Sequence, residues 1–268
     1  MSYYRYGAHA NANGIRQHYL RYGKKDTSQP VLLLIPGITS PAITWGFVAE
    51  RLAEHFDTYV LDVRGRGLSS TGSELLYDVD TCADDIVEFA KALDFKDFVV
   101  LGHSMGARFI TRALARGLTG VSNAVLVDPP VSGPSRRAYP SKLPWYVDSI
   151  KQSNEGMSAE DMLSFCPTWT EEQRQLRAEW LHTCYSPAIV KAFNDFHDDD
   201  FHKDLPGISV PVVLMVAGKG GVIQSEDEEE IVSLISELSI HHVMDAGHMI
   251  PWDDFDGFFV ALTDANII

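Results

Sequence analysis

The stretch that decides the fold is Gly102-His103-Ser104-Met105-Gly106, which matches the pattern G-x-S-x-G. An apolar run, Phe98-Val99-Val100-Leu101, precedes it, and a helical pattern from Ala107 to Leu118 follows it. The short pattern also arises by chance in glycine-bearing loops. A serine placed between a buried strand and a helix is instead typical of a nucleophile elbow, a sharp turn that exposes the serine hydroxyl. Glycines on both sides would let the strand and the helix approach closely.

The composition is that of an ordinary globular domain with a strong negative charge. The chain has 268 residues, of which 45% are hydrophobic and 22% are charged, and its formal net charge is −15. Such a charge excludes nucleic acids and anionic membranes as partners and leaves a small molecule as the expected substrate. An anionic substrate would need positive groups close to the site.

Compartment and membrane signals are few. The cysteines Cys82, Cys166 and Cys184 have no paired spacing, which predicts reduced thiols and a cytoplasmic protein. The first residues, Met1 to Tyr6, lack the apolar core of a signal peptide. No apolar run is long enough to span a bilayer. We expect a monomer or a homodimer.

Alternating strands and helices after an initial hairpin predict a mostly parallel sheet with helices on both faces. Asn13-Gly14 predicts the hairpin turn. The later strands are expected at Val31–Ile35, Thr58–Leu61, Phe98–Leu101, Ala124–Val127, Pro211–Ala217 and Ile240–Met244. Besides Ala107–Leu118, helices are expected over residues 45–56, from a cap at Thr81, and over residues 226–238.

Residues 133–207 break this alternation, since they hold no strand-like run and many aromatic residues. We interpret them as a helical lid inserted between the sixth and seventh strands, with residues 1–132 and 208–268 forming the core. The alternative is an arm that binds a partner. Ligands of open α/β sheets bind on the side where this insertion leaves the sheet, which favours the lid.

A serine hydroxyl needs a base within hydrogen-bonding reach, and that base needs an acid to orient it. In the chain order Ser…Asp…His, the base follows the last strand, where Gly247-His248 lies in a loop. His241 and His242 are competitors, but they lie within the strand itself. The sequence therefore predicts His248 as the base.

These motifs in this order resemble the α/β-hydrolase superfamily. The resemblance rests on the loop at Pro36-Gly37, on Asp62-Val63-Arg64-Gly65-Arg66-Gly67-Leu68-Ser69, on the elbow and on Gly247-His248. It implies an eight-stranded, mostly parallel sheet. It also implies an oxyanion hole made by the backbone N–H groups of Ile38 and Met105. Pro36 stands where the family usually has a histidine, which puts only the support of that loop in doubt.

The acid departs from the family pattern. Most members carry it after the next-to-last strand, where this chain has Gly218-Lys219-Gly220-Gly221. The next acids, Glu226 and Asp227, are typical of a helix start. Asp128 ends the strand after the elbow helix, where some members place the acid, although a simple turn residue before two prolines is the alternative. We predict a triad of Ser104, Asp128 and His248.

Within the superfamily, the chain is similar to the deformylases of aerobic nicotinate breakdown. That resemblance implies hydrolysis of N-formylmaleamate to maleamate and formate through a formyl-enzyme, with no metal and no cofactor. Three alternatives stay open: a carboxylesterase, a carbon–carbon bond hydrolase of ring-cleavage products, and a small-molecule receptor that retains the triad.

Contacts to the substrate are less defined. Arg64, Arg66 and Arg108 are the nearest candidates in the sequence to pair with its carboxylate, although a surface or structural ion pair is the expected role of each. Of the three, Arg108 is the one we carry forward. Among the lid aromatics, Trp145 and Tyr185 are expected to close over the substrate. His197 and His202 flank three aspartates, but a solvated acidic turn is expected there rather than a metal site.

Overall fold

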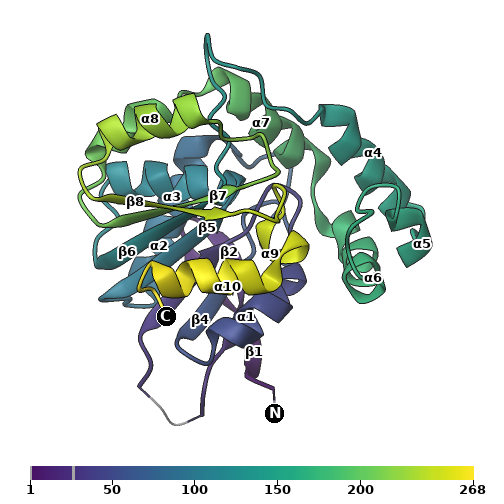
Figure 1. Ribbon diagram of the computed structural model, residues 1–268. Coiled ribbons are helices and arrows are strands. Elements are labelled where there is room, and N and C mark those ends of the chain that lie inside the picture. The colour runs from purple at the N-terminus through teal and green to yellow at the C-terminus, as the bar shows by residue number, and fades with distance from the viewer. Residues whose placement is uncertain (1, 26–27) are drawn as a thin grey trace.

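Eight strands form one sheet in the order β1-β2-β4-β3-β5-β6-β7-β8 (Figure 1). The computed structural model describes residues 2–25 and 28–268. β1 and β4 both pair antiparallel with β2, and all other neighbouring strands are parallel. The prediction of an eight-stranded, mostly parallel sheet is confirmed. The strands are β1 (Tyr4–Ala12), β2 (Ile15–Tyr22), β3 (Val31–Ile35), β4 (Asp57–Leu61), β5 (Phe98–His103), β6 (Val121–Val127), β7 (Val212–Ala217) and β8 (Leu238–Val243).

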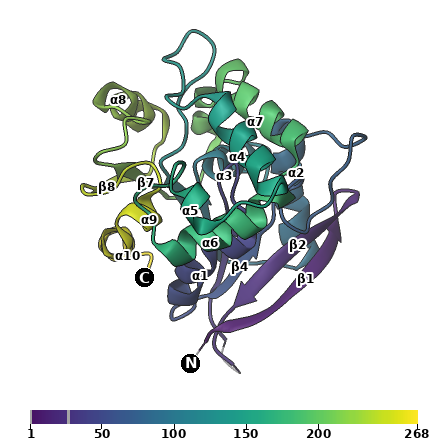
Figure 2. The same ribbon diagram turned by 90° about the vertical axis from the view of Figure 1, so that its right-hand side faces the viewer.

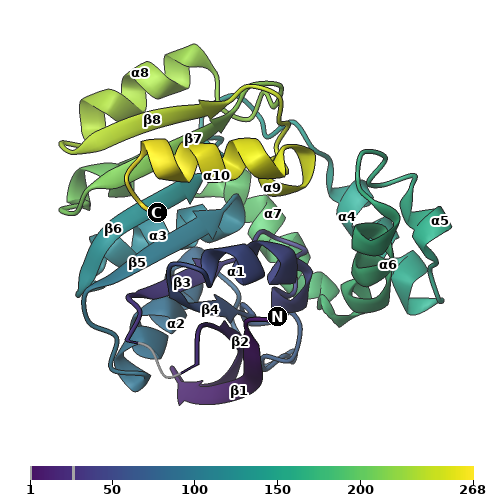
Figure 3. The ribbon, with the colours of Figure 1, turned by 60° about the horizontal axis from the view of Figure 1, so that its bottom comes forward.

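Helices cover both faces of the sheet. α1 and α10 lie on one face, while α2 and α3 pack against each other on the opposite face (Figure 3). The central strands are buried on both sides: Leu32, Leu33, Leu34 and Ile35 are all 0% exposed. The helices of the core are η1 (Ala42–Trp45), α1 (Gly46–Leu52), α2 (Val79–Ala92), α3 (Met105–Ala115), α8 (Ser225–Leu234), α9 (Ile250–Asp253) and α10 (Phe255–Asp264).

The predicted hairpin turn at Asn13-Gly14 is present. Both residues have positive φ, 49° and 73°, and Ala12 pairs with Ile15 directly across the turn. Two consecutive left-handed residues define the tight turn whose twist matches that of the flanking strands.

Boundaries of four predicted helices were wrong, and α3 spans Met105–Ala115 rather than Ala107–Leu118. Asp78, not Thr81, caps α2, because the Asp78 carboxylate accepts the Thr81 backbone N–H at 3.0 Å. α8 ends at Leu234, and Leu238 already pairs with Val212 as the first residue of β8. α1 ends at Leu52, so Phe56 lies in the turn that follows it. At the ends of α1 and α8, the apolar pattern continues past the point where the backbone hydrogen bonds change partners.

All of the chain between β6 and β7 is described, and it contains helices but no strand. α4, α5 and α6 lie beside the sheet rather than on its faces (Figure 1), and Figure 2 shows them from that side, in front of the sheet. These elements are α4 (Leu143–Asn154), α5 (Ala159–Met162), α6 (Glu171–Trp180), η2 (Leu181–Thr183), α7 (Ser186–Asp198) and η3 (His202–Gly207). Among the described helices, none combines the length and the hydropathy needed to cross a bilayer.

Candidate active site

Ser104 occupies the sharp turn between β5 and α3, with φ 53° and ψ −118°. Few non-glycine residues adopt positive φ, and such strain is typical of functional sites. The flanking glycines allow the turn: a Cβ on Gly102 would lie 2.6 Å from the Ala107 nitrogen, and a Cβ on Gly106 would collide with the Ile35 carbonyl oxygen. The predicted elbow geometry is therefore present.

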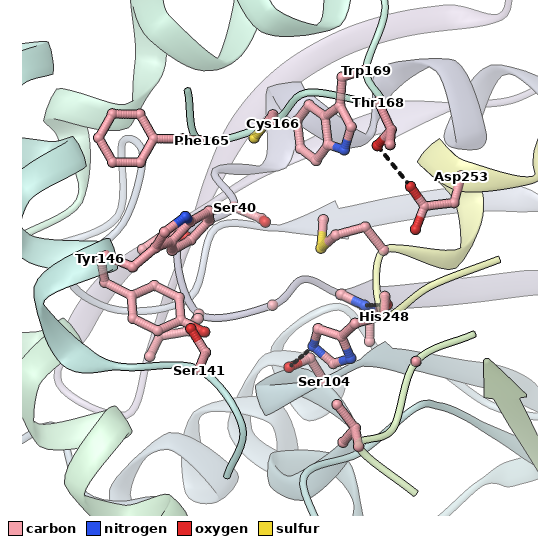
Figure 4. A pocket seen from close by; sticks show the side chains of 18 of the residues that line it. Ser40, Ser104, Ser141, Tyr146, Phe165, Cys166, Thr168, Trp169, His248 and Asp253 are labelled. Atoms are coloured by element: carbon pink, nitrogen blue, oxygen red, sulfur yellow. Dashed lines mark hydrogen bonds between the residues drawn. The ribbon is translucent and has the colours of Figure 1, made fainter. Parts of the chain in front are cut away.

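The three residues of the predicted triad lie together. His248 Nδ1 is 2.6 Å from Asp128 Oδ2, and His248 Nε2 is 3.0 Å from Ser104 Oγ (Figure 4). The carboxylate of Asp128 is fully buried and can only accept, so Nδ1 carries the proton and Nε2 presents its lone pair to the Ser104 hydroxyl. This arrangement can remove a proton from the serine as it attacks a carbonyl.

The candidate acids Glu226 and Asp227 and the candidate base His242 do not contact Ser104 or Asp128. Asp227 pairs with Arg137 and accepts the Gln224 N–H at 2.8 Å, so it caps α8. Glu226 is exposed, and His242 lies 3.1 Å from Glu228 on the sheet edge. The loop at residues 218–221 nevertheless approaches Asp128, because a Cβ on Gly220 would lie 3.6 Å from Asp128 Oδ2. The loop where most family members carry the acid and the end of β6, which carries Asp128, therefore lie next to each other.

The predicted oxyanion residues face each other across a buried arginine. Met105 begins α3, so its N–H has no acceptor within the helix. The Ile38 N–H has no acceptor among the described residues. Arg66 donates from Nε to the Ile38 carbonyl at 3.0 Å, and its Nη2 lies 3.3 Å from the Met105 sulfur. Arg66 therefore joins the loop of Ile38 to the first turn of α3, a structural role, and it does not line the cavity that opens above Ser104.

His103, the residue before Ser104, contacts the loop that carries His248. Its Nε2 lies 2.9 Å from the His248 carbonyl oxygen, which can only accept, so Nε2 carries the proton. Burial, with a smaller contribution from His248, lowers the pKa of His103 to about 3. His103 is therefore a neutral donor that fixes the loop of His248, and the sequence analysis assigned it no role.

A cavity of about 470 Å³ opens above Ser104, which is ample for a small ligand. Figure 4 shows Ser104 and His248 on one side and aromatic side chains from the segment between β6 and β7 on the other. The cavity is lined by Gly37, Ile38, Thr39, Ser40, His103, Ser104, Tyr139, Pro140, Ser141, Trp145, Tyr146, Phe165, Cys166, Pro167, Thr168, Trp169, Arg177, Gly220, Val222, His248, Met249 and Asp253.

Of the predicted substrate contacts, only Trp145 lines this cavity. Tyr185 packs instead against Tyr77, with ring centroids 5.7 Å apart. Arg64 forms a buried ion pair with Asp85 at 2.5 Å. Neither Tyr185 nor Arg64 lines the cavity that opens on Ser104.

Arg108 was also wrongly expected to contact the substrate. It is buried, and its two terminal nitrogens donate to four backbone carbonyls, those of Pro130, Ser132, Asp195 and Asp199. Arg108 therefore joins α3 to both ends of the segment between β6 and β7.

Tyr139 is a site residue that the sequence analysis counted only among the lid aromatics. Its hydroxyl lies 3.2 Å from His248 Nε2 and 3.4 Å from the Tyr146 hydroxyl. Burial raises the pKa of Tyr139 well above its usual value, so it remains a donor at neutral pH. The lone pair of His248 Nε2 is thus within reach of two hydroxyls, those of Ser104 and Tyr139.

The possible metal cluster near His197 does not form a ligand set. His197 Nδ1 lies 3.2 Å from the Phe193 carbonyl oxygen, and His202 is buried nearby. Across residues 2–25 and 28–268, no three His, Cys, Asp or Glu side chains are grouped so as to hold a metal ion.

Comparisons with known proteins agree with this architecture. Residues 30–255 match the family described as alpha/beta hydrolase fold. The chain is 62% identical over 264 residues to the N-formylmaleamate deformylase of Pseudomonas putida strain KT2440, which covers 98% of this chain and 97% of that protein.

Two crystal structures extend the comparison. That of the N-formylmaleamic acid deformylase from Pseudomonas putida strain S16 aligns with a TM-score of 0.92 at 52% identity, covering 96% of this chain and 100% of that one. An esterase from Exiguobacterium antarcticum aligns with a TM-score of 0.79 at 22% identity, covering 97% and 99%, and shares the fold.

Proposed function

Because the chain belongs to the α/β-hydrolase fold family, we propose that it is a serine hydrolase that converts N-formylmaleamate to maleamate and formate. The observation that carries this proposal is the 62% identity over 98% of the chain to a protein named N-formylmaleamate deformylase. The side chains of Ser104, His248 and Asp128, placed for acyl transfer, support it.

In the first half of the reaction, Ser104 Oγ attacks the formyl carbon while His248 Nε2 takes the hydroxyl proton. The N–H groups of Ile38 and Met105 hold the oxyanion of the tetrahedral intermediate. His248 then gives its proton to the amide nitrogen, the C–N bond breaks and maleamate leaves. That nitrogen is also acylated on its maleyl side, so it departs more readily than an ordinary amine.

In the second half, water attacks the formyl ester on Ser104 while His248 again acts as the base. Collapse of the second tetrahedral intermediate releases formate and returns the proton to Ser104. Asp128 accepts the hydrogen bond from the Nδ1–H of His248 throughout and stabilises the imidazolium without becoming protonated.

Residues 133–207 act in this proposal as a lid over the reacting groups, with residues 1–132 and 208–268 as the core. Support comes from the aromatic side chains that this segment contributes to the cavity wall, among them Trp145 and Tyr146. A wall of this kind lowers the local dielectric and keeps bulk water from the intermediate.

A cytoplasmic location and a monomeric or homodimeric state remain predictions. The three cysteines are free and buried, which agrees with a reducing compartment.

The test is formate release from N-formylmaleamate compared with hydrolysis of p-nitrophenyl acetate, using the intact chain and Ser104→Ala. We expect sustained formate release with the far larger kcat/KM and loss of both activities in a variant whose circular dichroism is unchanged. A larger kcat/KM for p-nitrophenyl acetate would indicate that the protein is a carboxylesterase. A single burst without turnover would indicate a receptor.

A further inference from the structure

Arg177, on α6, brings a buried cation to the cavity. The side chain is 3% exposed and lines the cavity that opens on Ser104. Nη1 donates to the Thr39 carbonyl at 3.0 Å, and Nη2 donates to Thr39 Oγ1 at 2.9 Å. The third nitrogen, Nε, is buried and has no hydrogen-bond partner among the described residues. A buried N–H without an acceptor is costly unless a ligand supplies one.

The charge of Arg177 is also uncompensated. Of the other buried arginines, Arg64, Arg108 and Arg112 each have an aspartate within 4 Å. Arg66 has none among the described residues, but each of its three nitrogens has a hydrogen-bond acceptor. Within the described part of the chain, Arg177 has no carboxylate at that distance. The rings of Trp145 and Trp169 flank the guanidinium, with centroids 5.7 and 5.5 Å from its central carbon. These rings stabilise and orient a cation, but they do not neutralise it.

The cavity has one other charged side chain, and that one is satisfied. Asp253 accepts the Thr168 hydroxyl and the Gly247 N–H, both at 3.0 Å (the first is drawn in Figure 4). Arg177 is the only lysine or arginine that lines the cavity in residues 2–25 and 28–268. A negatively charged ligand in this cavity therefore has a single full positive charge to meet.

We propose that Arg177 is the residue that binds the substrate carboxylate and so selects anionic amides over neutral ones. The Nε–H and the second N–H of Nη2 lie along one edge of the guanidinium, the fork that matches a carboxylate in a bidentate pair. Since Thr39 directly follows Ile38, the same arginine ties the bound carboxylate to the loop that carries an oxyanion donor. The inference rests on the proposed hydrolysis of N-formylmaleamate.

The first test compares N-formylmaleamate with its neutral analogue, in which a methyl group replaces the carboxylate. Arg177→Met removes the charge at similar length, and Arg177→Lys keeps the charge without the fork. Arg174→Gln is the matched control, because Arg174 also lies on α6 and donates to backbone carbonyls of Ala159 and Trp169 but does not line the cavity.

We expect Arg177→Met to lower kcat/KM for the anionic substrate about 10- to 100-fold, mainly through KM, which is the range of a charge-assisted hydrogen bond. Arg177→Lys should restore part of the loss. For the neutral analogue, kcat/KM should change little in both Arg177 variants. Arg174→Gln should leave kcat/KM unchanged for both substrates. Equal losses on both substrates would show that Arg177 only holds the loop at Thr39, and no loss on either would remove it from binding; both results overturn the proposal.

A second test does not depend on turnover. Calorimetry would measure binding of maleate, a dicarboxylate probe, to Ser104→Ala alone and combined with Arg177→Met or Arg174→Gln. We expect at least about tenfold weaker binding only when Arg177 is changed. This result would stand even if the wild-type chain proved to hydrolyse another acid. Equal binding to both double variants, or none to Ser104→Ala, would overturn the carboxylate site.

Discussion

Asp128 meets His248 because of where β6 ends. The backbone of Asp128 leaves the strand with φ 45°, and its N–H donates to the Met215 carbonyl at 2.8 Å. The Asp128 residue is 0% exposed. The carboxylate is thus fixed by two neighbouring strands rather than by a mobile loop. Such fixation is what an orienting acid needs, since it must hold one tautomer of the imidazole.

Replacing this carboxylate by its amide tests the assignment. Asp128→Asn should lower kcat by about 10⁴, because the amide N–H can donate to Nδ1 and favour the wrong tautomer, and the amide has no charge to stabilise the imidazolium. Asp227→Asn, the matched control, should leave kcat nearly unchanged, since Asp227 caps α8 and pairs with Arg137. Steady-state kinetics on folded variants decides. A severe loss of kcat in Asp227→Asn with a mild loss in Asp128→Asn would show that Asp227, which follows the later strand β7, is the acid.

His103 gives the molecule a specific acid sensitivity. Its pKa is about 3 in the folded protein, against 6.5 for an ordinary histidine. Between these values the unfolded chain binds more protons, so this contribution to stability is complete above pH 6.5 and is lost as the pH falls towards 3.

The difference between wild type and His103→Gln isolates that contribution, because every other titrating group is shared. As the pH falls from 6.5 to 4, the free energy of unfolding of the wild type should decrease more steeply, by up to about 1.4 kcal/mol per pH unit. Urea unfolding at a series of pH values measures the slope. Parallel pH dependences in the two proteins would mean that His103 titrates normally in the fold.

At the level of elements, Arg108 couples the elbow helix to the segment between β6 and β7. Its hydrogen bonds reach Pro130 and Ser132 just after β6, and Asp195 and Asp199 at the end of α7. Burial lowers the pKa of Arg108 to about 10, yet it remains charged at neutral pH. One side chain therefore fixes both the departure and the return of the inserted segment.

Arg108→Met should destabilise the protein by about 3 kcal/mol or more, because four buried carbonyls lose their donor. Arg116→Met, at the end of the same helix, should cost at most about 1 kcal/mol, since its pair with Asp84 is exposed. Thermal unfolding compares them. The activity of Arg108→Met should fall equally on anionic and neutral substrates. A loss confined to the anionic substrate, with unchanged stability, would show that Arg108 binds the substrate carboxylate.

On the scale of the whole molecule, the protein and its proposed substrate are both negatively charged. The formal net charge is −15, and the proposed substrate is an anion. The long-range field therefore repels the substrate, and only the local cation Arg177 attracts it. Salt screens the long-range part far more than a buried pair, because the screening length falls from about 30 Å at 0.01 M to about 8 Å at 0.15 M.

The value of kcat/KM for N-formylmaleamate should accordingly rise about two- to threefold between 0.01 and 0.15 M salt, through weaker repulsion on approach. The neutral analogue, measured in parallel, should show no such rise. A fall with salt for the anionic substrate would mean that a local attraction outweighs the field of the protein.

The sequence by itself determined the sheet, the elbow and the positions of Ser104, Asp128 and His248. The sheet and the elbow follow from local signals: continuous apolar runs mark buried strands, glycines mark the turn, and the ends of parallel strands meet at one edge. The choice of Asp128 also used the resemblance to the α/β-hydrolase superfamily. Even there it misplaced boundaries, as at Thr81, because an apolar stripe does not show which residue first leaves helical geometry.

Only the tertiary structure decided which buried polar groups meet. Arg177 donates a hydrogen bond to Thr39, which is 138 positions away in the chain, and the Tyr139 hydroxyl lies within hydrogen-bond distance of His248, 109 positions away. In the sequence, Arg108 and Arg177 are both arginines in helical patterns. In the structure, Arg108 donates to backbone carbonyls, whereas Arg177 lines the cavity and has an Nε–H without a partner among the described residues. Periodicity reports which face of an element is buried, whereas the partner of a buried charge is set by how the elements pack.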